Sequence, residues 1–231
     1  MQSPHSHPNR LPVTQKSPST KPMYSLYVVT DEKLSCGLTH AEIARRAVAG
    51  GANVIQLRDK EKSSRELYEI ACEIREICRD RSLFFVNDRL DIALAAKADG
   101  VHLGQDDLPI EAARQITPEN FLIGISVGNV DEARAAETAG ADYVAVSPVF
   151  TTASKTDAGV GHGVKAIRDI RAAVKCPVIG IGGINADNAA ELIDAGLDGV
   201  AVISAVVSAT DVTAAAENLS AIVRNAKEMR R

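Results

Sequence analysis

Four stretches of the chain repeat one pattern of apolar and polar positions. In each, an Ala-rich segment with helical spacing ends near a Gly, and a short apolar run follows. A Gly at this place allows the left-handed residue that ends many helices. A short run that is apolar throughout is typical of a parallel strand buried on both faces. The four stretches are Ala49–Val54, Lys97–Val101, Ala139–Val144 and Ala195–Val200.

The spacing of these stretches predicts the fold. Their apolar runs begin roughly 43 to 56 residues apart, which is too long for one strand-helix unit and suits two. We therefore expect further strands between them, and a helical pattern after every strand, from Thr39 to a last helix at Val212–Met229. The added strands are Leu26–Thr30, Leu83–Asn87, Phe121–Ser126 and Val178–Ile181.

Eight such units in about 208 residues match the lower end of the size range of α/β proteins with a (βα)8 TIM barrel. The alternative is an open, doubly wound sheet. Such a sheet normally has fewer strands, and no Gly-x-Gly-x-x-Gly motif follows the first strand here. The sequence therefore favours the closed barrel.

The composition of the chain distinguishes a folded domain from an N-terminal segment. Hydrophobic residues make up 45% of the 231 residues, aromatic residues only 3%, and Trp is absent, so we expect a core of Ala, Val, Ile and Leu. The first residues are instead rich in Pro, Ser, Thr and His, without apolar periodicity or a secretory signal. We predict a flexible N-terminal extension at residues 1–22 and a single catalytic barrel domain at residues 23–231.

Charge and cysteine content exclude several classes of protein. The net charge of -4 argues against nucleic-acid binding, which needs a basic surface. No apolar run approaches the roughly 20 residues of a membrane span. The 4 cysteines form no C-x-x-C pair, so we expect reduced thiols in a cytoplasmic protein rather than disulfides or zinc. The sequence does not determine the oligomeric state, and a homo-oligomer stays open.

Polar residues gather after the predicted strands, where the active site of such a barrel lies. Gln56, Arg58 and Lys60 alternate, so their side chains point to one side if the strand continues. Basic side chains at the rim of an apolar barrel need an anion, and a diphosphate supplies one. The alternative is that Arg58 pairs with Asp59 or another acid.

Asp88 and Asp107 follow the third and fourth strands, which are neighbours in a barrel. Two nearby carboxylates repel each other unless a cation offsets their charge. Mg2+ suits them, because it takes oxygen ligands from one or two carboxylates and from substrate phosphates. The alternatives are a helix N-cap for Asp88 and an ordinary surface carboxylate for Asp107.

The last two strand ends favour a phosphate. Gly182 and Gly183 expose backbone N–H groups, and Ser204 begins the next helix. Barrels often bind phosphate at these two loops through N–H donors and a helix dipole. The alternative is a tight turn without a ligand.

The loop from Ser147 to Gly163 has roughly 17 residues, a length typical of a functional lid or a disordered segment. Lys155 on such a lid would close over a phosphate; the alternative is a solvated lysine. His102 and His162 lie near the same rim. We assign neither of them a catalytic role.

The motifs and their order along the chain resemble those of the thiamine-phosphate synthase family, and the resemblance extends from Tyr24 to the C-terminal helix. Gly-Ile-Gly-Gly-Ile alone is weak evidence, because many phosphate-binding barrels carry it, whereas the ordered set is specific. The matching segments are Gln56–Lys60, Val86–Asp88, His102–Asp107, Gly124–Ser126, Ser147–Phe150 with Thr152–Lys155, Gly180–Ile184 and Val202–Ser204.

The resemblance implies a role for each matching residue. The pyrimidine and its diphosphate would be held by Gln56, Arg58, Lys60, Asn87, Ser126 and Lys155. The thiazole phosphate would be held by Thr152, Ser154, Gly183, Ile203 and Ser204. Leu57, Asp59 and Ala153 lie inside the same motifs and count among the substrate-binding residues. Asp88 and Asp107 would ligate Mg2+, and Arg58, Lys60, Ser126 and Lys155 would be the catalytic residues.

The implied reaction joins 4-amino-5-hydroxymethyl-2-methylpyrimidine diphosphate to 4-methyl-5-(2-hydroxyethyl)thiazole phosphate and releases pyrophosphate. The thiazole nitrogen would attack the exocyclic methylene by a dissociative path, because the aminopyrimidine supports a cation there. No protein nucleophile is then required. Positioning and charge neutralisation of the leaving group would carry the catalysis.

One position departs from the family. Many relatives have a His two residues after the Ser of the fifth strand, where this chain has Gly128. Related thiazole tautomerases use a His near that position and lack most of the diphosphate-binding set, so a tautomerase or a regulatory thiazole-phosphate-binding barrel is the alternative. A sugar-phosphate isomerase or aldolase leaves Gln56, Asn87 and Asp88 unexplained, and no strand interior offers a Schiff-base Lys.

Overall fold

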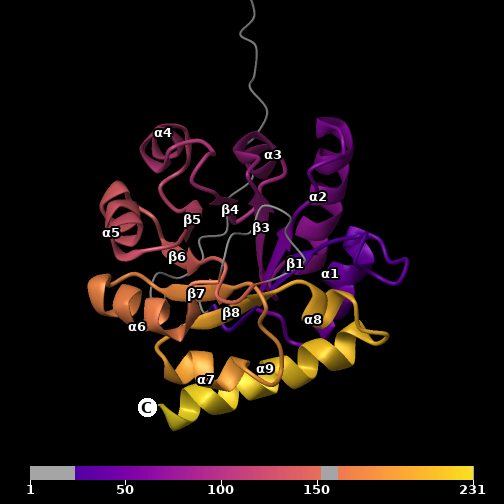
Figure 1. The fold of residues 1–231 in the computed structure, drawn as a ribbon. Helices are drawn as coiled ribbons and strands as arrows, with labels where there is room; N and C mark the ends of the chain where they lie inside the picture. The colour runs from indigo at the N-terminus through magenta and orange to yellow at the C-terminus, as the bar shows by residue number, and fades with distance from the viewer. Residues whose placement is uncertain (1–23, 152–160, 231) are drawn as a thin grey trace, which may run out of the picture.

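The computed structural model describes residues 24–151 and 161–230 and contains a closed barrel of eight parallel strands. The strands pair in sequence order, and β8 pairs with β1 to close the barrel (Figure 1). The predicted TIM barrel is confirmed. The strands are β1 Leu26–Thr30, β2 Val54–Leu57, β3 Leu83–Asn87, β4 Gly100–Leu103, β5 Leu122–Val127, β6 Tyr143–Val146, β7 Val178–Ile181 and β8 Gly199–Val202.

Helices surround the barrel, and α9 packs beside α1, α7 and α8 (Figure 1). The helices are α1 His40–Ala49, α2 Ser64–Cys78, α3 Leu90–Ala95, α4 Ile110–Ile116, α5 Val130–Ala139, α6 Gly163–Ala173, α7 Ala189–Asp194, α8 Ser204–Val207 and α9 Val212–Met229. α1 begins where predicted, because Thr39 and Glu42 form a capping box that satisfies backbone N–H groups at its start. Within the described residues, no helix is both long and apolar enough to cross a membrane.

The inside of the barrel corrects the expectation of a purely aliphatic core. Tyr27, Phe85 and Tyr143 are fully buried, and their rings contact one another with centroids 5.7 to 6.2 Å apart. Gly124 makes room for this cluster, since a Cβ on it would lie 2.0 Å from the Tyr143 ring. Three of the chain's eight aromatic residues therefore meet inside the barrel, where bulky side chains fill the space.

Strand register places the polar strand ends side by side at one rim. Asn87 lies opposite His102, and His102 lies opposite Gly124, two residues before Ser126. β5 runs one residue later than predicted, so Ser126 lies inside the strand rather than at its end. The predicted extension at residues 1–22 lies outside the described residues.

Candidate active site

Asp88 and Asp107 lie together at the rim, as their spacing predicted. Asp88 has a left-handed backbone with φ 60°, and its N–H donates to the carbonyl of His102 at 2.9 Å. The Oδ2 atom of Asp107 accepts from the backbone N–H of Gly104 at 2.6 Å. Burial and the adjacent Asp107 raise the pKa of Asp88 to about 6. Two acids that hinder each other's ionisation are suited to a cation.

The helix-cap alternative for Asp88 is not observed. α3 begins at Leu90, Arg89 is its N-cap residue, and no side chain caps that end. Asp88 instead takes a conformation that only Gly, Asn and Asp adopt at modest cost. Asp88 therefore does not cap α3.

Arg58 and Lys60 contribute positive charge to the same place. Both partly offset the raised pKa of Asp88, which shows that their charges lie close to the acidic pair. The alternative pairing of Arg58 with Asp59 is not observed, because Asp59 accepts hydrogen bonds from other groups. Leu57, which precedes Arg58, is buried, so a substrate contact from it has to come from the backbone.

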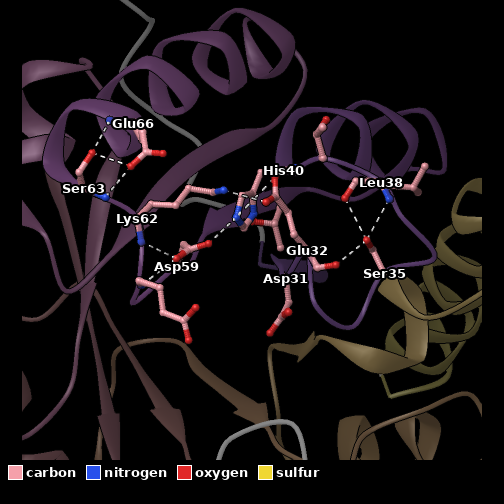
Figure 2. Close-up of polar contacts among 12 residues, drawn as sticks. Asp31, Glu32, Ser35, Leu38, His40, Asp59, Lys62, Ser63 and Glu66 are labelled. Atoms are coloured by element: carbon pink, nitrogen blue, oxygen red, sulfur yellow. Dashed lines mark hydrogen bonds and ion pairs between the residues drawn. The ribbon is translucent and has the colours of Figure 1, made fainter.

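Asp59 belongs to a group that the sequence analysis missed, which we call the loop clamp: Glu32, His40, Asp59 and Lys62 (Figure 2). His40 is buried, with Nδ1 2.8 Å from Thr30 Oγ1 and Nε2 3.1 Å from Asp59 Oδ2. The Lys62 ammonium lies 2.8 Å from Glu32 Oε2. The clamp therefore joins the loops after β1 and β2.

The loop clamp resembles a metal cage only in composition. The ligand atoms of Glu32, His40 and Asp59 lie within 4.8 Å of one another. Both ring nitrogens of His40 are engaged, and Asp59 Oδ1 accepts from the N–H groups of Glu61 and Lys62 at 2.8 and 3.0 Å. The Lys62 ammonium already provides the compensating charge. We therefore assign the clamp to holding the loop that carries Arg58 and Lys60.

Gln56 and Ser126 are each held from below by the barrel interior. The Nε2 group of Gln56 donates to Tyr27 Oη at 2.7 Å. Ser126 Oγ lies 3.0 Å from His102 Nε2, and the Ser126 carbonyl accepts from Gln105 Nε2 at 2.7 Å. His102, which received no role from the sequence, is thus a buried support of a predicted substrate residue.

The β7 and β8 loops form the other part of the rim. Gly182 and Gly183 have φ 106° and 65°, so both need glycine, and a Cβ on either would lie 2.7 Å from Pro148 or Phe150. Among the described residues, none accepts a hydrogen bond from the Gly183 N–H, which leaves that donor for an anion. Ser204 is exposed at the first residue of α8, after the buried Ile203.

Some predicted residues fall outside the described part of the chain. These are Thr152, Ala153, Ser154 and Lys155, and their proposed contacts stay predictions. The departure at Gly128 has a structural counterpart: a Cβ on Gly128 would lie 2.9 Å from two ring atoms of His162. The side chain of His162 therefore occupies the space beside Gly128.

The acidic pair, not the loop clamp, fits Mg2+. It offers carboxylate oxygens, which hard cations prefer, and burial together with Asp107 raises the pKa of Asp88, which a bound cation would counter. No histidine nitrogen contributes to the pair, which is consistent with Mg2+ rather than zinc.

The fold and this rim define a TIM-barrel protein with acidic and basic side chains gathered at the catalytic face. A family model described as thiamine monophosphate synthase matches residues 26–206. Thiamine-phosphate synthases of Methanoculleus marisnigri and Methanocella arvoryzae are 59% and 58% identical to the chain. The two alignments cover 88% and 87% of this chain and 97% and 95% of the relatives.

A solved structure agrees with these sequence relatives. The thiamine phosphate pyrophosphorylase from Pyrococcus furiosus superposes with a TM-score of 0.83 at 47% identity, over 89% of this chain and 98% of that one. The chain therefore belongs to the thiamine-phosphate synthase family and is a transferase of thiamine biosynthesis.

Proposed function

We propose that this transferase condenses 4-amino-5-hydroxymethyl-2-methylpyrimidine diphosphate with 4-methyl-5-(2-hydroxyethyl)thiazole phosphate. The products are thiamine phosphate and pyrophosphate. The observation that supports this most is the Asp88–Asp107 pair beside the charges of Arg58 and Lys60, because a diphosphate and its cation need both kinds of group.

The diphosphate end of the first substrate would lie at this charged part of the rim. Asp88 and Asp107 would hold Mg2+, which when bound would neutralise charge on the departing pyrophosphate. Arg58 and Lys60 would bind the outer phosphoryl oxygens, with Lys155 as a further predicted contact. These side chains would stabilise charge that grows as the bond to the leaving group breaks.

The other ends of the two substrates would be held by uncharged groups. Asn87, Gln56 and Ser126 would orient the pyrimidine, and the N–H of Gly183 with Ser204 would hold the thiazole phosphate, together with Thr152 and Ser154 as predicted. The methylene–oxygen bond to pyrophosphate breaks, and the thiazole nitrogen supplies the electron pair for the new carbon–nitrogen bond. No protein group has to be covalently modified, so catalysis rests on positioning.

Incubation of the purified protein with both substrates and Mg2+, with and without EDTA, tests this proposal. We expect thiamine phosphate only when Mg2+ is present. Asp107→Asn should abolish product, whereas Asp106→Asn, its exposed neighbour, is the matched control and should retain it. Metal-independent turnover would contradict the metal assignment. Well-folded protein that binds thiazole phosphate without turnover would favour a tautomerase or regulatory barrel instead.

A further inference from the structure

Five polar side chains from five strands form a continuous row of hydrogen bonds inside the barrel. Gln56 Nε2 is 2.7 Å from Tyr27 Oη, and Tyr27 Oη is 3.1 Å from Tyr143 Oη. Tyr143 Oη is 2.8 Å from His102 Nδ1, and His102 Nε2 is 3.0 Å from Ser126 Oγ. The two ends of this row are proposed to contact the pyrimidine substrate, whereas its three middle members contact no substrate in that proposal.

When Gln56 donates an amide hydrogen to Tyr27, every hydrogen bond of the row has the same direction, that is, each residue donates to the next. Tyr27 then has one hydrogen of its own, and Tyr143 Oη is its acceptor among the described residues. Burial raises the pKa of both phenols above their ordinary value, so both keep their hydrogens. Tyr143 therefore donates to His102 Nδ1. In this direction His102 Nδ1 accepts from Tyr143, and His102 Nε2 carries the hydrogen that is donated to Ser126.

A hydrogen on His102 Nδ1 does not fit this row. His102 would then donate to Tyr143, and Tyr143 would have to donate to Tyr27. The Tyr27 oxygen would receive two hydrogens, and its own hydrogen would lose its acceptor in a dry interior, which is costly. The orientation of the Gln56 amide and that of the Ser126 hydroxyl are therefore coupled across the barrel.

We propose that Tyr27, Tyr143 and His102 are positioning residues that fix Gln56 as a hydrogen-bond acceptor and Ser126 as a donor toward the pyrimidine substrate. This inference rests on the proposed function. Because Gln56 Nε2 donates to Tyr27, the orientation of the amide is fixed, and Oε1 is its acceptor atom for a ligand. Gln56 is buried one residue before the end of β2, at the rim where the substrate is proposed to bind.

The chemistry of the two ends matches an aminopyrimidine diphosphate. An exocyclic amine offers hydrogens, which Gln56 Oε1 accepts. Ring nitrogens and phosphoryl oxygens offer lone pairs, to which the Ser126 hydroxyl donates. If the hydrogen bonds of the row had the opposite direction, Gln56 would present a donor to the amine and Ser126 would offer no hydrogen. The direction of these bonds therefore decides which edge of the substrate is recognised.

The tautomer of His102 tests the direction without any need for activity. Nitrogen-15 NMR of imidazole-labelled protein at neutral pH, with the His102 signals assigned by their loss in His102→Asn, reports which ring nitrogen carries hydrogen. We expect the neutral Nε2–H form in the wild type. A hydrogen on Nδ1, alone or in a charged ring, would overturn the proposal even if the enzyme makes thiamine phosphate.

Steady-state kinetics of Tyr143→Phe and Tyr24→Phe test the consequence for binding. Tyr24 is the matched control, because its ring lies 4.7 Å from that of Tyr143 while its buried hydroxyl has no partner among the described residues. We expect Tyr143→Phe to raise KM for the pyrimidine diphosphate about tenfold with little change in KM for the thiazole phosphate.

Tyr27→Phe interrupts the same row one bond earlier and should reproduce this effect if Tyr143→Phe fails to fold. Tyr24→Phe should behave as the wild type. Equal effects of Tyr24→Phe and Tyr143→Phe, or equal changes in both KM values, would show a merely structural role and overturn the proposal. A wild type that makes no product would refute the proposed function, while the His102 tautomer would still decide the direction of the row.

Discussion

The Nε2 atom of His40 lies 3.1 Å from the Oδ2 atom of Asp59, across the gap between the loops that follow β1 and β2. His40 is buried at the start of α1, and Asp59 is the residue between Arg58 and Lys60. The contact therefore ties the basic loop of the rim to a rigid helix.

Replacement of His40 should destabilise the protein and the loop that carries Arg58 and Lys60. His40→Ala removes the bonds to Thr30 and Asp59 and should lower the free energy of unfolding by about 1–3 kcal/mol. Binding of the pyrimidine diphosphate should weaken as well, because Arg58 and Lys60 lose their support. Urea denaturation and KM measurements check both effects.

Glu61→Gln is the control for that variant. Glu61 pairs with Lys33 between the same two loops, but both side chains are about 70% exposed, and exposed pairs contribute little. It should leave stability and KM nearly unchanged. If His40→Ala behaves like Glu61→Gln, the clamp does not support the site.

The free energy of unfolding should depend on pH through the ionisation of Asp59. Burial alone would raise the pKa of Asp59, but hydrogen bonds from Glu61, Lys62 and His40 lower it overall. Its stabilising effect is then complete above its ordinary value of 3.8 and is lost as pH falls through the lower folded value. Asp59→Asn should therefore destabilise the protein at pH 7, and the difference from wild type should shrink in acid. Thermal unfolding of both proteins at several pH values checks this. A difference in stability that stays constant with pH would contradict it.

Asp88→Asn should raise the stability of the metal-free protein and abolish its activity. The folded pKa of about 6 lies above the ordinary 3.8, so in metal-free protein the stability from protonated Asp88 is present below pH 3.8 and lost as pH rises through 6. Asn also adopts the left-handed backbone that this position requires. The variant should gain about 1 kcal/mol at pH 7.5, reduced for solvent screening of this partly exposed group, and lose turnover.

The check on Asp88→Asn is thermal unfolding with EDTA and with Mg2+, beside the activity assay. Mg2+ should stabilise the wild type and not the variant. A variant that is less stable than the wild type in EDTA would show that Asp88 serves the fold rather than a cation.

Two glycines of the fifth strand and its loop should respond very differently to Ala. In Gly124→Ala the new methyl would lie 2.0 Å from the buried Tyr143 ring, so we expect a loss of about 3 kcal/mol or failure to fold. In Gly128→Ala it would lie 2.9 Å from the exposed side chain of His162, which can move, so the loss should stay below about 1 kcal/mol. Similar unfolding midpoints in urea would contradict the description of the barrel interior.

The repeated Ala-rich and apolar pattern predicted the barrel because the signal for each strand and helix is local. Leu83–Asn87 and Val178–Ile181 were predicted with the bounds that the structure shows, and Val212–Met229 is the last helix as expected. The predicted helix start at Ser204 is confirmed by α8, but its end at Val207, before α9, was not predicted, because four residues are too few to show a periodicity. β5 was misplaced by one residue, because the apolar Phe121 precedes the strand and the apolar Val127 follows Ser126.

The sequence by itself determined the fold and the set of polar residues at the catalytic rim, because parallel strands of a barrel all end on the same face. Only the tertiary structure decided their partners. It paired Asp59 with His40 rather than Arg58, and it turned the scarce aromatic residues into a buried cluster. Partners across strands depend on register and barrel closure, which bring together residues such as Tyr27 and Tyr143, 116 positions apart, that no local pattern relates.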